Sequence, residues 1–150
     1  MIFLQDHLDA WLGASKARVI LPITDPYVVH HGALGSFATV YIDQSVMAEV
    51  VQKLKAMPGI EQVLTNKEAS DQFELPPDRI GDLVIVSQKS VVLGTSASKH
   101  DLSGLDAPLR SHGGVSEQTV PLLFNRTISS APSRRLRNFD VMELVLNQTH

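Results

Sequence analysis

The stretch FATVYIDQSVMAEVVQKLKAMPGIEQVLTNKEASDQF, residues 37–73, carries the pattern that decides the fold of this chain. Residues 37–42 alternate in the way that a strand does. From Ser45 to Met57 the apolar residues recur at helical spacing, and Glu49 is spaced to pair with Lys53. The stretch therefore opens with a predicted strand and a predicted helix, which Pro58-Gly59 would end.

The second half of the stretch predicts another strand and another helix. Residues 60–64 form a short apolar strand pattern, and residues 65–68, Thr-Asn-Lys-Glu, have the form of a capping box. This box would start a helix that runs to about Phe73. Beyond it, residues 82–87 and 91–93 predict a β-hairpin, so the middle of the chain is predicted to be a compact α+β unit.

The N-terminal residues predict a helix and a strand. Apolar side chains recur at helical spacing from Leu4 to Leu12, and Gly13 is placed to end the helix as a left-handed C-cap. Residues 1–3 leave no room for a strand before this helix. Residues 18–23 are apolar and β-branched, which predicts a buried strand closed by a turn.

Two more elements are predicted near the C-terminus. Val120 to Phe124 has a strand-like pattern, and residues 139–148 predict a final helix that Asn138 can cap. The buried face of this helix is predicted to include Val141, Leu144 and Val145.

Composition and charge exclude several classes of protein. The 150 residues are 43% hydrophobic and 19% charged, which is typical of a globular domain. The formal net charge of -3 argues against nonspecific nucleic-acid binding, and no apolar run approaches the ~20 residues needed to span a bilayer. The basic run at residues 134–137 is interpreted as a solvated or carboxylate-paired surface segment.

The chain contains no cysteine, so any metal must be bound by His, Asp, Glu or hydroxyl groups. A cytoplasmic location is expected.

The sequence Arg110-Ser111-His112-Gly113-Gly114 contains the first candidate site residue. The two glycines after His112 predict a tight loop, since glycine permits close approach of the backbone to a ligand. Spacing alone leaves two interpretations open. His112 is either a metal ligand or catalytic residue, or an ordinary loop histidine that is exposed or hydrogen-bonded.

Asp25, His30 and His31 form a second candidate cluster. Adjacent histidines on a strand point to opposite faces, so His30 and His31 cannot readily bind one metal together. One of them could face a site while the other packs, or the cluster could be a strand end held by local hydrogen bonds. His100-Asp101 lies in a polar connection and is predicted to be solvated.

Several long segments resemble one enzyme family. Residues 21–41, LPITDPYVVHHGALGSFATVY, strongly resemble phosphonoacetate hydrolases, which are members of the alkaline phosphatase superfamily. Further segments match that family in their order and spacing. They are residues 73–76, 78–82, 109–114, 117–118, 120–121 and 136–140. The resemblance covers nearly the whole chain.

This resemblance implies an activity, a cofactor and a substrate. In the family, two zinc ions flank the substrate phosphonate, a threonine is the nucleophile, and the products are acetate and phosphate. His112 matches the last zinc ligand of the family, which joins an Asp and a His supplied earlier in the chain. Asp25, His30 and His31 are expected to lie near the substrate, which would be phosphonoacetate or a related small phosphonate.

The resemblance also implies how the chain is divided. We expect an α/β fold, the C-terminal part of an alkaline-phosphatase-like α/β core with an α+β cap subdomain. Residues 1–30 would give a core helix and strand, residues 31–108 the cap-like subdomain, and residues 109–150 a return to the core with the metal-ligand loop, a strand and the C-terminal helix.

One departure from the family pattern affects the predicted activity. The nucleophilic threonine and the other zinc ligands belong upstream of the point that matches Met1, so we expect a partial protein that is inactive alone. Its exposed core surface would favour self-association. The alternative is an independent, non-catalytic α+β module that binds a ligand or a protein partner.

Overall fold

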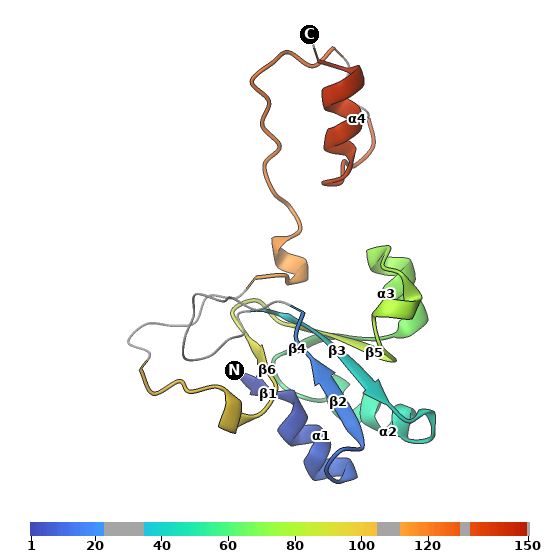
Figure 1. Ribbon diagram of the computed structural model, residues 1–150, viewed down its shortest axis with the longest axis vertical. Coiled ribbons are helices and arrows are strands. Elements are labelled where there is room, and N and C mark those ends of the chain that lie inside the picture. Colours follow the sequence, from blue (N-terminus) through green and yellow to red (C-terminus); the bar gives the residue numbers. More distant parts are fainter. Residues whose placement is uncertain (23–34, 105–111, 130–132, 150) are drawn as a thin grey trace. The chain divides into compact units, whose positions relative to one another are not determined.

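The computed structural model describes residues 1–22, 35–104, 112–129 and 133–149 (Figure 1). The chain divides into two compact units, Met1–Gln118 and Thr119–His150, called unit 1 and unit 2 below. Unit 1 contains two sheets flanked by helices, and unit 2 contains one helix and extended chain. The predicted boundary near residue 30 falls outside the described residues.

The larger sheet of unit 1 has four antiparallel strands in the order β2-β3-β5-β4. The strands are β2 Ala17–Ile20, β3 Phe37–Ile42, β4 Ile60–Thr65 and β5 Leu83–Ser87. In the register, Val40 of β3 lies opposite Val19 of β2 on one side and Leu83 of β5 on the other. The strands predicted at 37–42, 60–64 and 82–87 are confirmed to within a residue.

Helices cover both faces of this sheet because the apolar residues of its strands point to both sides. On β5, Leu83 and Ile85 belong to the larger core, while Val84 and Val86 belong to a smaller core on the other face. Helices α1 Leu4–Leu12 and α2 Gln44–Lys55 pack into the larger core, and α3 Asn66–Phe73 packs into the smaller one. The predicted helices are thereby confirmed as the layers of a mixed α/β fold.

The helix ends follow local side-chain chemistry. The capping box of α3 is confirmed: the Thr65 backbone N–H donates to Glu68 Oε2 at 2.8 Å, and the Glu68 N–H donates to Thr65 Oγ1 at 3.4 Å. The Glu49–Lys53 pair on α2 is also confirmed, at 2.6 Å. Gly13 ends α1 with a φ of 92°, but its ψ of 154° is not left-handed helical, so this C-cap prediction was wrong in its geometry.

A second sheet of two short parallel strands corrects two predictions. β1, Ile2–Phe3, precedes α1 directly, and it pairs with β6, Leu93–Gly94, so the expectation of no strand before the helix was wrong. The hairpin prediction was also wrong, because β6 pairs with β1 instead of β5. The Ser87 hydroxyl donates to the Val91 carbonyl at 2.6 Å, which closes a turn that leads the chain away from β5.

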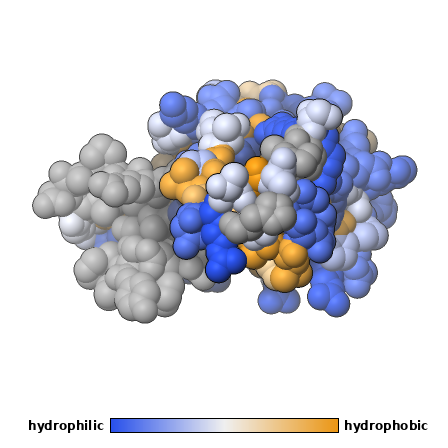
Figure 2. Space-filling view, turned by 90° about the horizontal axis from the view of Figure 1, so that it is seen from above, coloured by the Kyte–Doolittle hydropathy of each residue, from blue (hydrophilic) through white to orange (hydrophobic). Residues whose placement is uncertain are grey.

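Short 3₁₀ helices connect several of these elements. They are η1 Pro77–Arg79, η2 Ala97–Lys99 and η3 Val115–Glu117. None of the helices in the described parts of the chain is long and apolar enough to cross a membrane. On the face seen in Figure 2, hydrophobic residues reach the surface in patches between hydrophilic ones.

Unit 2 contains α4, Asp140–Asn147, where the sequence predicts its last helix. Asn138 is not the cap, because Phe139 occupies the N-cap position and has no side-chain cap hydrogen bond. Leu144 is buried and Val141 is half-buried, but Val145 is 46% exposed and was wrongly predicted to be buried.

The strand predicted at residues 120–124 was wrong. In the described residues of unit 2 the structure has no strand, only an isolated bridge between Ile128 and Thr149. Val120 and Leu123 are exposed, and a strand needs a neighbour for its backbone groups, which residues 120–124 do not have among the described residues of unit 2.

Candidate functional site

The backbone of His112 is joined to the residues that lead into β3. Gly35 and His112 form an isolated parallel bridge, and the Ser36 N–H donates to the His112 carbonyl oxygen at 2.9 Å. The Ser36 carbonyl accepts from the Ser87 N–H at 2.9 Å, and the Gly35 carbonyl accepts from the Leu93 N–H at 3.0 Å. The loop that carries His112 is thereby tied to both sheets of unit 1.

The two glycines after His112 form the tight loop that the sequence predicts. Gly113 has a φ of 82°, in the left-handed region that side chains avoid. Gly114 is buried against Ser36, whose Cβ would lie 3.4 Å from a side chain added at Gly114. The Gly114 N–H donates to Glu117 Oε2 at 3.3 Å, and the Glu117 N–H donates to the Gly114 carbonyl at 3.0 Å. The described residues thus show close approach of this loop to Ser36.

Two pockets adjoin this loop. The first, of about 330 Å³, is lined by Phe37, Phe73, Leu75, Val86, Gly113, Gly114, Val115, Glu117 and Gln118. The second, of about 470 Å³, is lined by Ile20, Pro22, Phe37, Thr39, Tyr41, Leu75, Pro76, Arg79, Ile80 and Gly113. Phe37, Leu75 and Gly113 line both. The walls are largely apolar, Arg79 brings a cation to the second pocket, and Phe37 packs edge-on against Phe73 with ring centroids 6.0 Å apart.

These pocket residues were not predicted as a site. Phe73 and Leu75 belong to a segment that resembles the family, residues 73–76, and this is the signal that could have pointed to them. The structure brings this segment to the glycines after His112, which lie about forty residues later in the sequence. Chemically, the pockets provide apolar contact surface at the glycines that follow His112.

The described residues do not make a complete metal site. His112 is exposed, and no group of three His, Asp or Glu residues within the described ranges is close enough to hold a metal ion. One imidazole does not fit the donor set of zinc, which normally has at least three protein ligands. Asp25, His30 and His31 lie outside the described residues, so their roles near a substrate stay predictions.

His100 has a structural role that the sequence did not indicate. It is buried, its Nε2 accepts from the Thr95 backbone N–H at 2.9 Å, and its ring stacks on Phe3 with centroids 6.1 Å apart. The prediction that His100 is solvated was therefore wrong. Its neighbours in the sequence are polar, but the packing partner Phe3 lies almost a hundred residues earlier.

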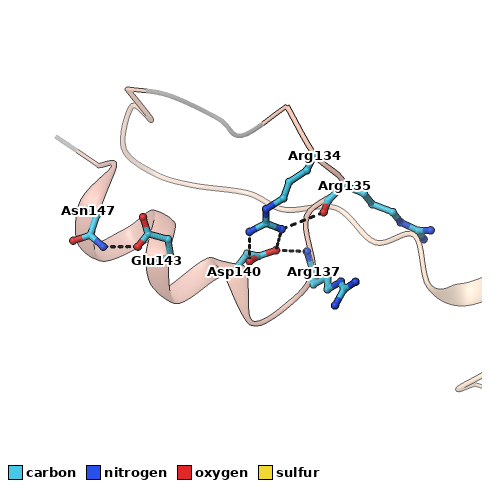
Figure 3. A network of polar contacts seen from close by, with 6 residues as sticks. All are labelled: Arg134, Arg135, Arg137, Asp140, Glu143 and Asn147. Atoms are coloured by element: carbon cyan, nitrogen blue, oxygen red, sulfur yellow. Dashed lines mark hydrogen bonds and ion pairs between the residues drawn. The ribbon is translucent and has the colours of Figure 1, made fainter. Parts of the chain in front are cut away.

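The prediction of a carboxylate-paired surface segment at residues 134–137 is confirmed for Arg134. Arg134 forms a bidentate pair with Asp140, with N–O distances of 2.7 and 2.6 Å, and the Arg137 N–H donates to the same carboxylate at 2.8 Å (Figure 3). The hydrogen bonds from Arg134, followed by that from Arg137, lower the pKa of Asp140 from 3.8 to about 2. This network holds the start of α4.

Comparison with known proteins identifies relatives of this chain. No protein-family profile matches the sequence. A phosphonoacetate hydrolase from Penicillium oxalicum is 68% identical over 72 residues, which are 47% of this chain and 89% of that protein. Crystal structures of phosphonoacetate hydrolase from Sinorhizobium meliloti 1021, in complex with phosphonoformate and with phosphonoacetate, match with 58% identity and TM-scores of 0.79 and 0.78.

The extent of these matches differs between the two relatives. The structural match covers 93% of this chain but 34% of the Sinorhizobium enzyme, so the chain spans about a third of the length of that enzyme. The Penicillium relative, in contrast, is covered over most of its length. On this identity and coverage, the chain belongs to the phosphonoacetate hydrolase family.

Proposed function

We propose that this chain supplies the C-terminal part of a zinc-dependent hydrolase that cleaves the carbon–phosphorus bond of phosphonoacetate to acetate and phosphate. The observation that carries this proposal is the 58% identity, over 93% of the chain, to an enzyme crystallised in complex with phosphonoacetate. The family resemblance adds the reaction and the zinc. We expect the complete enzyme to act in the cytoplasm.

The meeting of two family segments supports a site at the His112 loop. Residues 73–76 and residues 112–114 are far apart in sequence, but Phe73, Leu75 and Gly113 line one pocket. Concave apolar walls with a few polar groups are typical of small-molecule sites. The substrate side of the complete site would therefore lie beside this pocket.

In this proposal His112 is one zinc ligand, and its partners are an Asp and a His from the part of the family enzyme that this chain does not cover. Its exposed side chain and its tethered backbone suit that role. When bound, zinc would offset charge on the phosphoryl oxygens. Asp25, His30 and His31 would lie near the substrate.

The family resemblance suggests a division into core and cap, which the two sheets follow in part. Parallel strands occur almost only in sheets buried on both faces, so the two-stranded parallel pair of β1 and β6 is typical of the edge of a larger α/β sheet. We propose that residues 1–30 and 109–150 belong to an alkaline-phosphatase-like core. Residues 31–108 would form the α+β cap, which contains β3, β4 and β5 of the larger sheet. Two strands cross this division, because β2 of the larger sheet lies within residues 1–30 and β6 of the parallel pair lies within residues 31–108.

The experiment is to co-express this chain with the two thirds of the Sinorhizobium enzyme that lie outside the match. The purified complex is assayed for phosphate release from phosphonoacetate, and its zinc content is measured. Since a single imidazole does not hold zinc well, the chain alone should release no phosphate. The complex should bind zinc and be active.

The test of His112 compares His112→Ala with His7→Ala, an exposed histidine of α1. His112→Ala should lower zinc content and slow phosphate release by at least about tenfold, the loss typical of a weakened metal site. His7→Ala should match the unchanged complex. If the His112→Ala complex has the same zinc content and activity as the unchanged complex, His112 is not a zinc ligand. A complex of the unchanged chain that neither binds zinc nor releases phosphate would favour the non-catalytic module.

A further inference from the structure

The chain after His112 passes through a residue with unusual backbone freedom. The His112 carbonyl is fixed by the Ser36 N–H, but Gly113 follows it with no side chain and a φ of 82°. Because glycine has more conformational freedom to lose than any other residue, its conformation must be set by the residues on both sides. Gly114 is therefore the point at which the fold can fix the other end of the His112 loop.

Glu117 bonds both backbone polar groups of Gly114. Its Oε2 accepts from the Gly114 N–H at 3.3 Å, and its own N–H donates to the Gly114 carbonyl at 3.0 Å. The second bond belongs to the 3₁₀ turn of η3, whereas the first depends on the Glu117 side chain. An ionised carboxylate is a stronger acceptor for a backbone N–H than a neutral group is. The Glu117 carboxylate thus closes the loop that follows His112.

The 3₁₀ helix that carries Glu117 is anchored in the smaller core of unit 1. Val115 of η3 is half-buried and packs against that core, whose buried members are Ala69, Ile80, Val84 and Val86. Gly114 is buried against Ser36. All of these residues belong to unit 1. The contacts of Glu117 therefore join the His112 loop to α3 and β5.

We propose that Glu117 is a positioning residue for His112. Its carboxylate fixes the peptide group of Gly114, two residues after His112, so that the backbone from which the imidazole projects keeps one conformation. Groups behind a metal ligand that fix its geometry typically change metal affinity by about 10–100-fold. Glu117 would act through the backbone, without binding zinc itself. The inference rests on the proposed function, because it takes zinc as the partner of His112 from there.

Three substitutions separate the position of the Glu117 carboxylate from its charge. Glu117→Gln keeps an oxygen acceptor at the same reach but removes the charge, and Glu117→Asp keeps the charge but shortens the side chain. Glu117→Ala removes both. Ser116→Ala, at an exposed neighbour in η3, is the matched control. Circular dichroism and urea unfolding of each chain measure whether its fold is retained.

Two measurements follow the loop and the metal separately. In the chain alone, NMR gives the hydrogen-exchange rate of the Gly114 amide and the ring signals of His112. In the complex with the co-expressed part of the Sinorhizobium enzyme, competition with a chelator gives the zinc affinity. Glu117→Ala and Glu117→Asp should speed the exchange, shift the ring signals and weaken zinc binding by at least about tenfold. Glu117→Gln and Ser116→Ala should remain close to the unchanged chain in all three.

Unchanged His112 ring signals and unchanged zinc affinity in Glu117→Ala would overturn the inference, since Glu117 would then only cap η3. A glutamine variant as impaired as the alanine variant would also overturn it, because the negative charge and not the hydrogen bond would then matter. If the complex of the unchanged chain binds no zinc, the proposed function fails. The exchange rate and the ring signals of the chain alone still decide in that case whether Glu117 positions His112.

Discussion

The carbonyl oxygen of His112 accepts a hydrogen bond from the backbone N–H of Ser36 at 2.9 Å, and Ser36 is itself 3% exposed. The backbone of the candidate ligand is therefore held by the fold of unit 1. A functional side chain is held more accurately when the surrounding structure fixes its backbone. The loop geometry should accordingly be sensitive to residues that never touch a ligand.

Gly113→Ala should destabilise unit 1 by about 1–2 kcal/mol, because a side chain at a φ of 82° is strained. Urea unfolding followed by circular dichroism measures this change. Gly104→Ala is the control, since an added Cβ there has no atom within 4 Å. Equal stability of the two variants would contradict the strain that we assign to Gly113.

Thr65→Ala should cost about 1 kcal/mol of stability, because the Glu68 N–H loses its acceptor at the start of α3. Thr65→Ser retains the hydroxyl and should lie close to the unchanged chain. Thermal unfolding of the three proteins gives the comparison. If Thr65→Ser lowers the stability as much as Thr65→Ala does, the hydroxyl is not the group that caps α3.

Gln5→Ala should lower stability by about 1–3 kcal/mol, since it leaves two backbone groups of the edge strand β2 without their partner. The side-chain amide of Gln5 accepts from the Val19 N–H and donates to the Ala17 carbonyl, both at 2.9 Å. A freed strand edge also promotes aggregation. Light scattering and urea unfolding measure both effects, and Gln52→Ala, at an exposed position of α2, should show neither.

Acidification should loosen the start of α4. The pKa of Asp140 is lowered to about 2 by Arg134 and the Arg137 N–H, so its ionised form stabilises the folded state above the usual pKa of 3.8. That contribution is lost as the pH falls from about 4 through about 2. NMR signals of residues 134–140 should shift in this pH range, and Asp140→Asn should remove this pH-dependent shift. If the shift persists unchanged in Asp140→Asn, it arises from another titrating group.

Local patterns in the sequence predicted much of unit 1. The elements of residues 37–73 were found because their helical spacing, strand alternation and the capping box at Thr65 are all contained within a few neighbouring residues. The pairing of β1 with β6 and the burial of His100 against Phe3 were missed, since both join segments more than ninety residues apart. A strand of two residues is also too short to produce a pattern.

The candidate site was predictable to a smaller extent. The glycines after His112 predicted a tight loop, and the family resemblance pointed to His112 itself. Its attachment to Ser36 and the pocket lined by Phe73 and Leu75 depend on how distant segments pack, which no local pattern records. The strand predicted at residues 120–124 failed because a short apolar run does not show whether another strand will lie beside it to pair with its backbone.

The parallel register of Ile2 with Leu93 joins residues about ninety positions apart, so we expect this pairing to form late in the folding of unit 1. Closing a loop of this length costs conformational entropy before any contact compensates for it, whereas β3, β4 and β5 join through nearer residues. β1 can therefore pair only after residues 93–94 have been made. In the folded protein this short pairing of β1 with β6 should also be the first contact between strands of unit 1 to open.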